Sequence, residues 1–438
     1  MSLDRPDHVL IVGAGAVGLT TAWFLQRHGV HVTVLDRKGV AGDSSWGNAG
    51  WLAPSLTLPL PEPSVLRYGI RAVFDSSSPV YVPPAADPRL LRFLTTFAMH
   101  CTRSRWEAAM AVFAEVNRIA LGAYDDLVDG GISEPVRPAE PFLAGFATDA
   151  DREVLAEEFR YANAHGADID YTLISGDQAR AMEPVLGDGV RAAIRIEGQR
   201  YIDPPRFISS VADAVRARGG VIVEDFDVDD IVDHGRRGVE AVGSGGDTRS
   251  ADVVVIANGA RLNSLARKFG VRTIVQAGRG YSFSVTPERL PRRPVYLPAQ
   301  RVACTPLSDR FRVAGMMEFR RPDAPRDPRR IRAIIEAARP MLTGIDWDAR
   351  SEEWVGSRPC TADGLPLVGG TRSERVYVAG GHGMWGIALG PLTGRMLADK
   401  ITGHPTPAVM ADLDPLRSGV RRDRAGHSAP TPRQTADV

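Results

Sequence analysis

The chain has 438 residues, of which 44% are hydrophobic and 24% charged, the balance of an ordinary globular protein. Lysine plus arginine and aspartate plus glutamate number 53 each, so no overall positive charge points to a nucleic-acid partner. No apolar run approaches the roughly 18 residues that span a bilayer, and three dispersed cysteines argue against a disulfide framework or a metal site.

Residues 9–36 carry a complete dinucleotide-binding pattern. An apolar strand is predicted over 9–12, a helix that ends at Gly29 follows a glycine turn, and a second strand covers 32–35. A lone glycine turn is weak evidence, because such turns are common. The two strands, the helix and the closing acid together indicate a nucleotide-binding βαβ unit.

Each part of this unit has a physical task. Gly13 allows a tight turn, Gly15 lets the backbone approach a pyrophosphate, and Gly18 lets the helix pack on the strand. The start of the helix, at Ala16 and Val17, presents N–H groups to phosphates. Asp36 lies 18 residues after Gly18, close to the roughly 20 expected for an acid that binds the adenosine ribose.

The rest of the chain alternates between irregular and regular patterns. Residues 39–50 are predicted to form a loop at the carboxyl end of a sheet, and the proline-rich stretch 52–88 to be irregular. Helical patterns follow at about 89–130 and 149–165, and α/β signals return at 203–260, where a buried strand ends at Asn258-Gly259. Strand-like runs fill much of 271–320 and precede a helix at about 327–341.

The last regular unit is a strand, a glycine-rich turn and a helix, and the tail beyond it is poor in apolar residues. We expect an α/β fold with a discontinuous Rossmann-like domain and an α+β second domain built on an antiparallel sheet. The predicted nucleotide domain comprises 1–53, 203–271 and 352–405. The predicted second domain comprises 54–202 and 272–351, and 412–438 is expected to be a disordered tail.

Only the glycine turn at 13–18 carries the complete dinucleotide-binding fingerprint; GHGMWG at 381–386 has the same glycine spacing but no second strand and acid after its helix. If a flavin occupies the turn at 13–18, no obvious site remains for NAD(P)H, and the electrons would come from an organic substrate. The alternative at this point is that the single site binds NAD directly.

Six further blocks resemble the FAD-dependent D-amino-acid oxidase/dehydrogenase superfamily, most closely its bacterial D-amino-acid dehydrogenase branch. They are SSWGNAG at 44–50, DPRLLRFLTTFAMHCTRSRW at 87–106, GRGYSFSV at 278–285, FRVAGMMEF at 311–319, VGSRPCTADGLPLVGGT at 355–371 and AGGHGMWGIALGPLTGRMLAD at 379–399. The resemblance spans most of residues 9–402, and it implies FAD as the cofactor.

The resemblance also implies which residues hold the flavin. Residues of the 44–50 block would lie along the ring, Val228 near the adenine, and the 381–387 turn would cap the ring with N–H groups. The complete set is Gly13, Gly15, Ala16, Val17, Gly18, Asp36, Arg37, Ser44, Ser45, Asn48, Ala49, Gly50, Val228, Asn258, Gly259, Gly381, His382, Gly383, Met384, Gly386 and Ile387.

Three residues are candidates for the chemistry. Arg358 matches an arginine that pairs with the substrate carboxylate in related amine oxidases, where a planar guanidinium can form two parallel hydrogen bonds. Tyr281 would bind the same carboxylate or line the pocket, and His382 would contact the flavin or substrate, or simply stabilise its turn. Trp385 would either shape the substrate pocket or pack between the two domains. Cys360 does not align with the covalent flavin cysteine of related enzymes, so non-covalent FAD is expected.

The implied reaction is hydride transfer from the α-carbon of a D-amino acid to flavin N5, followed by hydrolysis to a 2-oxo acid and ammonia. Alternatives are an amine oxidase of the same fold acting on glycine, sarcosine, proline-like or other secondary amines, an NAD-dependent dehydrogenase, and a flavin-bound protein with only a binding or structural role. The acceptor would be oxygen or a quinone-type carrier. We expect a cytoplasmic protein, peripheral at the inner membrane face if the acceptor is a membrane quinone.

Overall fold

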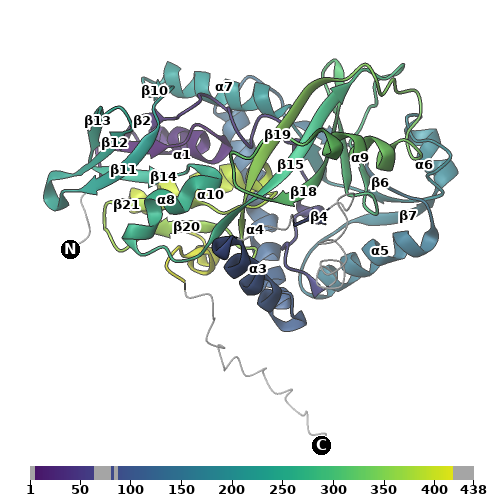
Figure 1. Cartoon of the computed structure of the whole chain (residues 1–438), viewed down its shortest axis with the longest axis horizontal. Coiled ribbons are helices and arrows are strands. Elements are labelled where there is room, and N and C mark those ends of the chain that lie inside the picture. Colours follow the sequence, from purple (N-terminus) through teal and green to yellow (C-terminus); the bar gives the residue numbers. More distant parts are fainter. Residues whose placement is uncertain (1–4, 64–79, 83–86, 418–438) are drawn as a thin grey trace, which may run out of the picture.

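The computed structural model describes residues 5–63, 80–82 and 87–417, and Figure 1 shows two sheet-containing regions side by side. Much of the proline-rich stretch predicted to be irregular, at 64–79 and 83–86, lies outside the described residues. So does 418–438 of the predicted tail. No helix in the described part is long and apolar enough to cross a membrane.

The first sheet has five parallel strands and one antiparallel edge strand. In spatial order they are β10 (Val221–Val223), β2 (His31–Leu35), β1 (His8–Val12), β14 (Val253–Ile256), β21 (Val376–Gly380) and the antiparallel β20 (Leu367–Gly370). Val9 and Ile11 face one apolar core, whereas Leu10 and Val12 face another. Burial on both faces explains why β1 is an unbroken apolar run.

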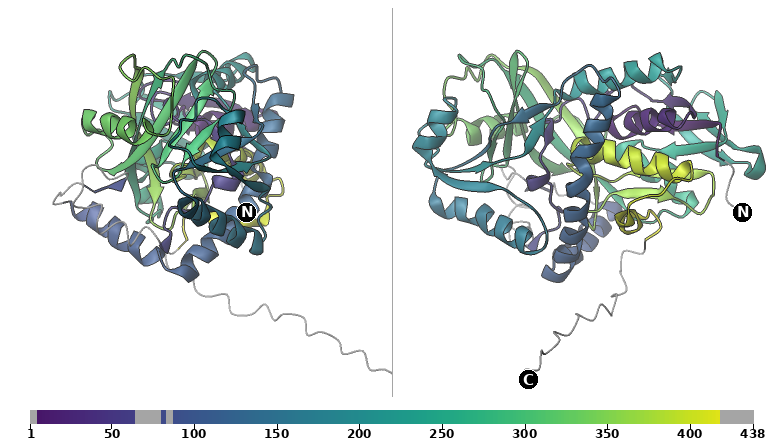
Figure 2. Two further views of the ribbon diagram at one scale, coloured as in Figure 1. Left: turned by 90° about the vertical axis from the view of Figure 1, so that its right-hand side faces the viewer. Right: turned by 180° about the vertical axis from the view of Figure 1, so that it is seen from behind.

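Helices cover one face of this sheet, and a small antiparallel sheet covers the other. The helical face carries α1 (Ala16–Arg27), α4 (Arg103–Asp129), α7 (Pro204–Ala217) and α10 (Gly386–Ile401). The opposite face carries β11 (Val228–Asp233), β12 (Val239–Gly243), β13 (Thr248–Ala251) and α8 (Leu262–Ala266). Seen from behind in Figure 2, α1 in purple lies beside α10 in yellow.

Small residues allow α1 and α10 to pack closely. A Cβ on Gly394 of α10 would lie 2.7 Å from the backbone of Thr20 in α1. The Thr20 hydroxyl lies 3.1 Å from the carbonyl oxygen of Gly390. Only glycine at 394 permits this approach, so the pairing of the two helices is specified locally.

A proline inside α10 changes the hydrogen bonding of its first turn. Pro391 has no N–H to donate to the carbonyl of Ile387, four residues earlier. The hydroxyl of the buried Tyr124 donates to that carbonyl instead, at 2.6 Å. A side chain of α4 therefore replaces a backbone hydrogen bond in α10.

The second sheet is mainly antiparallel and has nine strands. Along its main path they are β19 (Ser351–Thr361), β15 (Val275–Val285), β18 (Arg310–Phe319), β17 (Val302–Leu307), β16 (Val295–Leu297), β6 (Phe142–Phe146), β8 (Ala192–Ile196) and β7 (Tyr171–Ser175), with β4 (Val80–Tyr81) beside β18. The β16–β6 and β4–β18 pairs are parallel.

Further helices and a small sheet pack around these layers. The helices are α3 (Pro88–His100), α5 (Asp149–Ala164), α6 (Gly176–Met182) and α9 (Pro328–Ala338), the small sheet is β3 (Trp51–Leu52), β9 (Gln199–Tyr201) and β5 (Arg137–Ala139), and the 3-10 turns are η1 (Pro54–Leu56), η2 (Gly235–Arg237), η3 (Gly259–Arg261), η4 (Arg267–Phe269) and η5 (Ala408–Leu413).

Helices α3, α7 and α9 all begin with Asp-Pro, a pattern that presets the first helical turn. Asp87 and Asp327 accept hydrogen bonds from backbone N–H groups of the helices that they cap. Asp203 makes no such bond, and its carboxylate lies 3.3 Å from the guanidinium of Arg310.

The α/β class predicted from sequence is confirmed. The helix predicted at 89–130 is divided into α3 and α4 at Cys101–Thr102. The predicted start of the tail, 412, is too early, because Leu413 is 1% exposed and Arg417 forms an ion pair with Asp363. The composition of the predicted tail, which is poor in apolar residues, did not indicate these contacts.

The predicted domain boundaries stay a proposal, and two elements bear on them. β19 opens the predicted segment 352–405 of the nucleotide domain but pairs with β15 of the second sheet. α4, within the predicted segment 54–202 of the second domain, packs on α10.

Candidate active site

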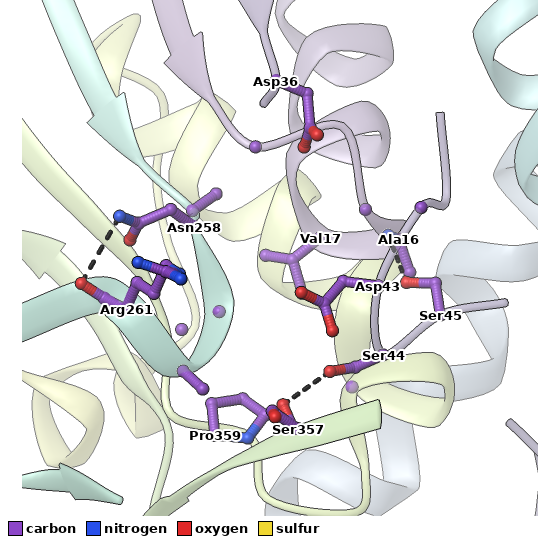
Figure 3. A pocket seen from close by; sticks show the side chains of 18 of the residues that line it. Ala16, Val17, Asp36, Asp43, Ser44, Ser45, Asn258, Arg261, Ser357 and Pro359 are labelled. Carbon is purple, nitrogen blue, oxygen red and sulfur yellow. Dashed lines mark hydrogen bonds between the residues drawn. The ribbon is translucent and has the colours of Figure 1, made fainter. Parts of the chain in front are cut away.

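A cavity lies at the carboxyl ends of β1, β2 and β14, where open α/β sheets bind ligands. Figure 3 shows Asp36 on one side of it and Ser357 with Pro359 on the other. We call the part lined by Gly13–Val17 and Asp36 the turn end, and the part lined by Arg358 and Pro359 the arginine end.

At two of the three glycines of the G-x-G-x-x-G turn, neighbouring backbone atoms leave no room for a side chain. Gly13 has φ +121°, and a Cβ there would lie 2.4 Å from the carbonyl oxygen of Ala257. A Cβ on Gly18 would lie 1.9 Å from the carbonyl oxygen of Gly13. Gly15 is less constrained, since its nearest neighbour would be the Ser45 hydroxyl at 3.3 Å. Gly18 supports the turn from behind and does not line the cavity.

Asp36 lines the cavity and also stabilises the glycine turn. Its Oδ2 accepts from the backbone N–H of Ala14 at 2.7 Å, and its Oδ1 accepts from Lys38 at 2.8 Å and Gly39 at 3.0 Å. A carboxylate has about four acceptor positions, so Asp36 retains acceptor capacity for a ribose hydroxyl. Arg37 beside it lies 3.1 Å from Asp43.

The loop at 39–50 joins the two ends. Ser45 Oγ accepts from the first amide of α1, that of Ala16, at 3.1 Å, so this amide is not free for a phosphate. Ser44 donates to the carbonyl of Ser357 at 2.5 Å. Ser44, Ser45 and Asn48 line the cavity, whereas Ala49 and Gly50 do not.

The turn after β14 presents polar atoms without partners. Asn258 Oδ1 and Arg261 Nε are buried and have no hydrogen bond to any described residue. Both residues line the cavity, as Gly259 does. Buried polar atoms are rarely left unpaired, so these two are available to a ligand.

His382 is a structural residue of the turn before α10. It is 2% exposed, its Nε2 lies 2.8 Å from the Thr393 hydroxyl, and burial lowers the pKa of its imidazole to about 4. The ring is therefore neutral at pH 7. His382, Gly383, Met384, Gly386 and Ile387 line the cavity, but Gly381 does not. Trp385 is partly buried, donates to the carbonyl of Leu58 at 2.7 Å and packs against the core on the helical face of the first sheet.

Arg358 is the cation of the arginine end. Its Nη1 donates to the carbonyl of Met316 at 2.7 Å, and no carboxylate of a described residue lies within ion-pair distance. Burial lowers the pKa of its guanidinium. An arginine stays charged even so, and a desolvated cation without a counter-ion favours an incoming anion.

Two features of the second sheet position Arg358. A Cβ on Gly280 would lie 2.3 Å from the Arg358 guanidinium, so that group lies directly over a glycine of β15. The β15–β18 register shifts between Arg279 and Tyr281, and in this bulge Met316 has φ +61°. A strained bulge beside a cavity is typical of a functional site.

Tyr281 does not line the cavity, contrary to expectation. It is fully buried, and its hydroxyl donates to Glu318 at 2.9 Å and accepts from the N–H of Asp327 at 3.3 Å. Side chains alternate along a strand, so Tyr281 points away from the face that carries Gly280 and Arg358. Cys360 is 1% exposed, and burial raises the pKa of its thiol to about 12.

A family model described as "FAD dependent oxidoreductase" matches residues 8–400. This chain belongs to the FAD-dependent oxidoreductase family. The D-amino acid dehydrogenase of Xanthobacter autotrophicus is 30% identical over 93% of this chain and 98% of its own. That of Xylella fastidiosa is 30% identical over 93% and 95%.

Solved structures share the fold of this FAD-dependent oxidoreductase. Glycine oxidase from Geobacillus kaustophilus is 21% identical with a TM-score of 0.71, and covers 95% of this chain and 100% of its own. Iminodiacetate oxidase from Chelativorans is 20% identical with a TM-score of 0.70, covering 93% and 98%. The family model, which matches residues 8–400, confirms FAD as the cofactor.

The residues at the cavity fit FAD. The glycine turn allows the backbone to approach a pyrophosphate, and Asp36 offers acceptors to a ribose. The unpartnered atoms of Asn258 and Arg261 supply further polar contacts. Val228 lines the cavity together with its chain neighbours Phe226 and Asp227, so apolar and polar contacts to an adenine are both available.

Several lining residues of the oxidoreductase were missed by the sequence analysis. Most are chain neighbours of predicted residues, so a wider window around each motif would have found them. Pro322, from the loop after β18, had no signal in the sequence. The missed set is Val12, Leu35, Lys38, Gly42, Asp43, Phe226, Asp227, Ala257, Ala260, Arg261, Pro322, Ser357, Pro359, Ala379 and Gly380.

Proposed function

We propose that this protein oxidises a D-amino acid to the 2-oxo acid and ammonia. The observation that carries the proposal is Arg358, a cavity-lining cation with no carboxylate partner among the described residues. A substrate carboxylate supplies the missing counter-ion through two parallel hydrogen bonds. The names of the 30% identical relatives support an amino acid of D configuration.

The chain's own residues bind and orient the reactants. Gly13, Gly15, Asp36 and Asn258 would hold FAD in the cavity. Cys360 is buried and does not line the cavity, so it would form no covalent bond to the flavin. FAD supplies the acceptor, at N5, for the hydride that leaves the substrate α-carbon. Arg358 fixes the carboxylate and thereby the direction of the α-carbon–hydrogen bond.

No protein base is needed at the arginine end. His382 is neutral at pH 7, but its Nε2 is occupied by Thr393 and its ring is buried. The substrate amine therefore loses its proton to water before the oxidation, and its lone pair assists departure of the hydride. Water then hydrolyses the imine, which releases ammonia and the 2-oxo acid.

The test is anaerobic bleaching of the bound flavin by a panel of D-amino acids, L-amino acids, glycine, sarcosine and proline. D-amino acids are expected to bleach fastest. Faster bleaching by glycine, sarcosine or L-proline would instead assign a secondary-amine or glycine oxidase, and no bleaching by any amine would refute the proposal.

Arg358→Ala is expected to raise KM by about 100-fold with unchanged flavin content, since a charge-assisted bidentate contact is lost. Arg375→Ala is the matched control, because Arg375 is also partly buried and donates to a backbone carbonyl, that of Asp252 at 2.9 Å. An equal rise of KM in both variants would remove Arg358 from the substrate site.

We also propose that a quinone-type carrier reoxidises the flavin, since the 30% identical relatives are named dehydrogenases. Bleached protein is expected to recover its colour faster with a soluble ubiquinone analogue than with air. Faster recovery in air would assign an oxidase.

A further inference from the structure

A second cavity lies outside the FAD site, at the far end of the β15–β19 strand pair. It has a volume of about 430 Å³. Four arginines line it, Arg92, Arg272, Arg372 and Arg417, together with His100 and a single acid, Asp363. They come from segments far apart in the sequence. In Figure 1, α3, which carries Arg92, lies beside the yellow C-terminal segment.

The single acid is already neutralised. The guanidinium of Arg417 contacts both carboxylate oxygens of Asp363, at 2.8 and 3.1 Å, and also donates to the carbonyls of Leu365 and Pro366 at 2.8 Å. This pair is a fixed part of the wall: burial by itself would raise the pKa of the Asp363 carboxyl, but the charge and hydrogen bonds of Arg417 hold that pKa below its ordinary value. The pair has no net charge, so Asp363 does not compensate the positive charge of the other three arginines.

The remaining three arginines have no counter-ions. Arg92, Arg272 and Arg372 form no side-chain hydrogen bond or ion pair with a described residue, and each is exposed to solvent. Arginine supplies all but three of the 53 basic residues, so its presence alone means little. Exposed arginines without an acidic partner are common among the described residues, so the feature that needs an explanation is that three of them gather around one cavity.

The cavity is partly prearranged. Arg92, Thr96 and His100 are spaced four residues apart on α3 and therefore lie on one face of that helix. The stem of Arg372 packs over Gly270, where a Cβ would lie 2.7 Å from its Cδ. Fixing the stem lowers the entropy lost when the guanidinium binds an oxyanion.

We propose that this cavity binds a multiply charged oxyanion, a soluble phosphate- or pyrophosphate-bearing small molecule. Three guanidinium groups match the charge and the several acceptor oxygens of such a ligand. The volume exceeds that of one phosphate group, which favours a ligand with at least two charged groups or a phosphate on a larger body.

The test is calorimetric titration of the FAD-loaded protein with inorganic pyrophosphate at constant ionic strength. We expect one saturable site, with an affinity about ten-fold weaker or more in Arg272→Ala/Arg372→Ala. Arg236→Ala/Arg237→Ala is the matched control, because these exposed arginines between β11 and β12 also lack side-chain partners among the described residues. Absence of saturable binding, or equal weakening in both double variants, would overturn the proposal.

Two further measurements exclude other sources of the signal. The flavin absorbance must stay constant during titration, since release of FAD would place pyrophosphate at the cofactor site and contradict the proposal. Sedimentation with vesicles of phosphatidylglycerol and phosphatidylcholine tests a lipid source of the phosphate. Vesicle binding without pyrophosphate binding would overturn the proposal that the ligand is a soluble small molecule.

Discussion

The turn end and the arginine end of the FAD cavity are built in different ways. At the turn end, Gly13 meets the carbonyl of Ala257, and Gly18, which supports the turn from behind, meets the carbonyl of Gly13. At the arginine end, Gly280 meets the tip of one side chain, that of Arg358. Backbone atoms in a packed turn cannot move aside, but a guanidinium can. Damage at the turn end therefore affects folding and cofactor together, whereas damage at the arginine end affects the substrate alone.

Gly18→Ala gives the largest effect expected from this comparison. Its Cβ would lie 1.9 Å from a backbone oxygen, so the turn or helix α1 must shift. We expect loss of most bound FAD and destabilisation by about 3 kcal/mol or more. The ratio of flavin to protein absorbance and thermal melting measure both. Gly15→Ala is the control for stability, because its Cβ would meet only the Ser45 hydroxyl at 3.3 Å, and equal destabilisation of the two variants would contradict the steric argument.

Gly280→Ala tests the arginine end without removing its arginine. The new methyl group would displace the Arg358 guanidinium, so KM is expected to rise by about ten-fold or more at constant flavin content. Steady-state kinetics with the best substrate of the panel measure this. A normal KM would show that Arg358 is not held in its functional position by this contact.

His382 predicts a pH dependence of stability. Its folded pKa of about 4 lies below its ordinary value of 6.5, so between these values the unfolded chain binds a proton that the folded chain does not. The contribution of the neutral His382 ring to the free energy of unfolding is fully present above pH 6.5. It declines as the pH falls toward 4, by about 3 kcal/mol in total. Denaturant unfolding at several pH values measures this decline. His382→Gln should show a decline smaller by about that amount, and an identical decline would refute the assignment.

Tyr281→Phe is expected to have the smallest effect on the substrate. Its hydroxyl contacts Glu318 and Asp327 on the face of β15 away from Arg358, so KM should change by less than about two-fold. The free energy of unfolding should fall by about 1–3 kcal/mol, because a buried acceptor loses its donor. A large rise in KM would return Tyr281 to the substrate site.

The two ends of the cavity also differ in how well the sequence predicted them. Gly13, Gly15 and Asp36 form one contiguous motif with a local geometric meaning, and all three line the cavity. Arg358 was found through a resemblance of sequence blocks, and its position depends on a pairing of β19 with β15, some 80 residues earlier in the chain.

Tyr281 shows why the remainder could not be predicted. Its neighbour Gly280 contacts the Arg358 guanidinium, yet strand alternation sends the tyrosine into the opposite core. Which face of a buried strand meets the cavity depends on the register and bulges of the whole sheet. Pro322 and the arginines of the second cavity likewise come together only through tertiary packing.

Because of Pro391, flavin binding depends on a residue outside the flavin site. The proline leaves the Ile387 carbonyl to Tyr124, and Ile387 lines the cavity. The geometry of this wall is therefore set from outside the nucleotide-binding motifs, by a helix that contributes no residue to the cavity lining. A substitution that loosens α4 would appear in an assay as weakened flavin retention, although the βαβ unit itself remained unaltered.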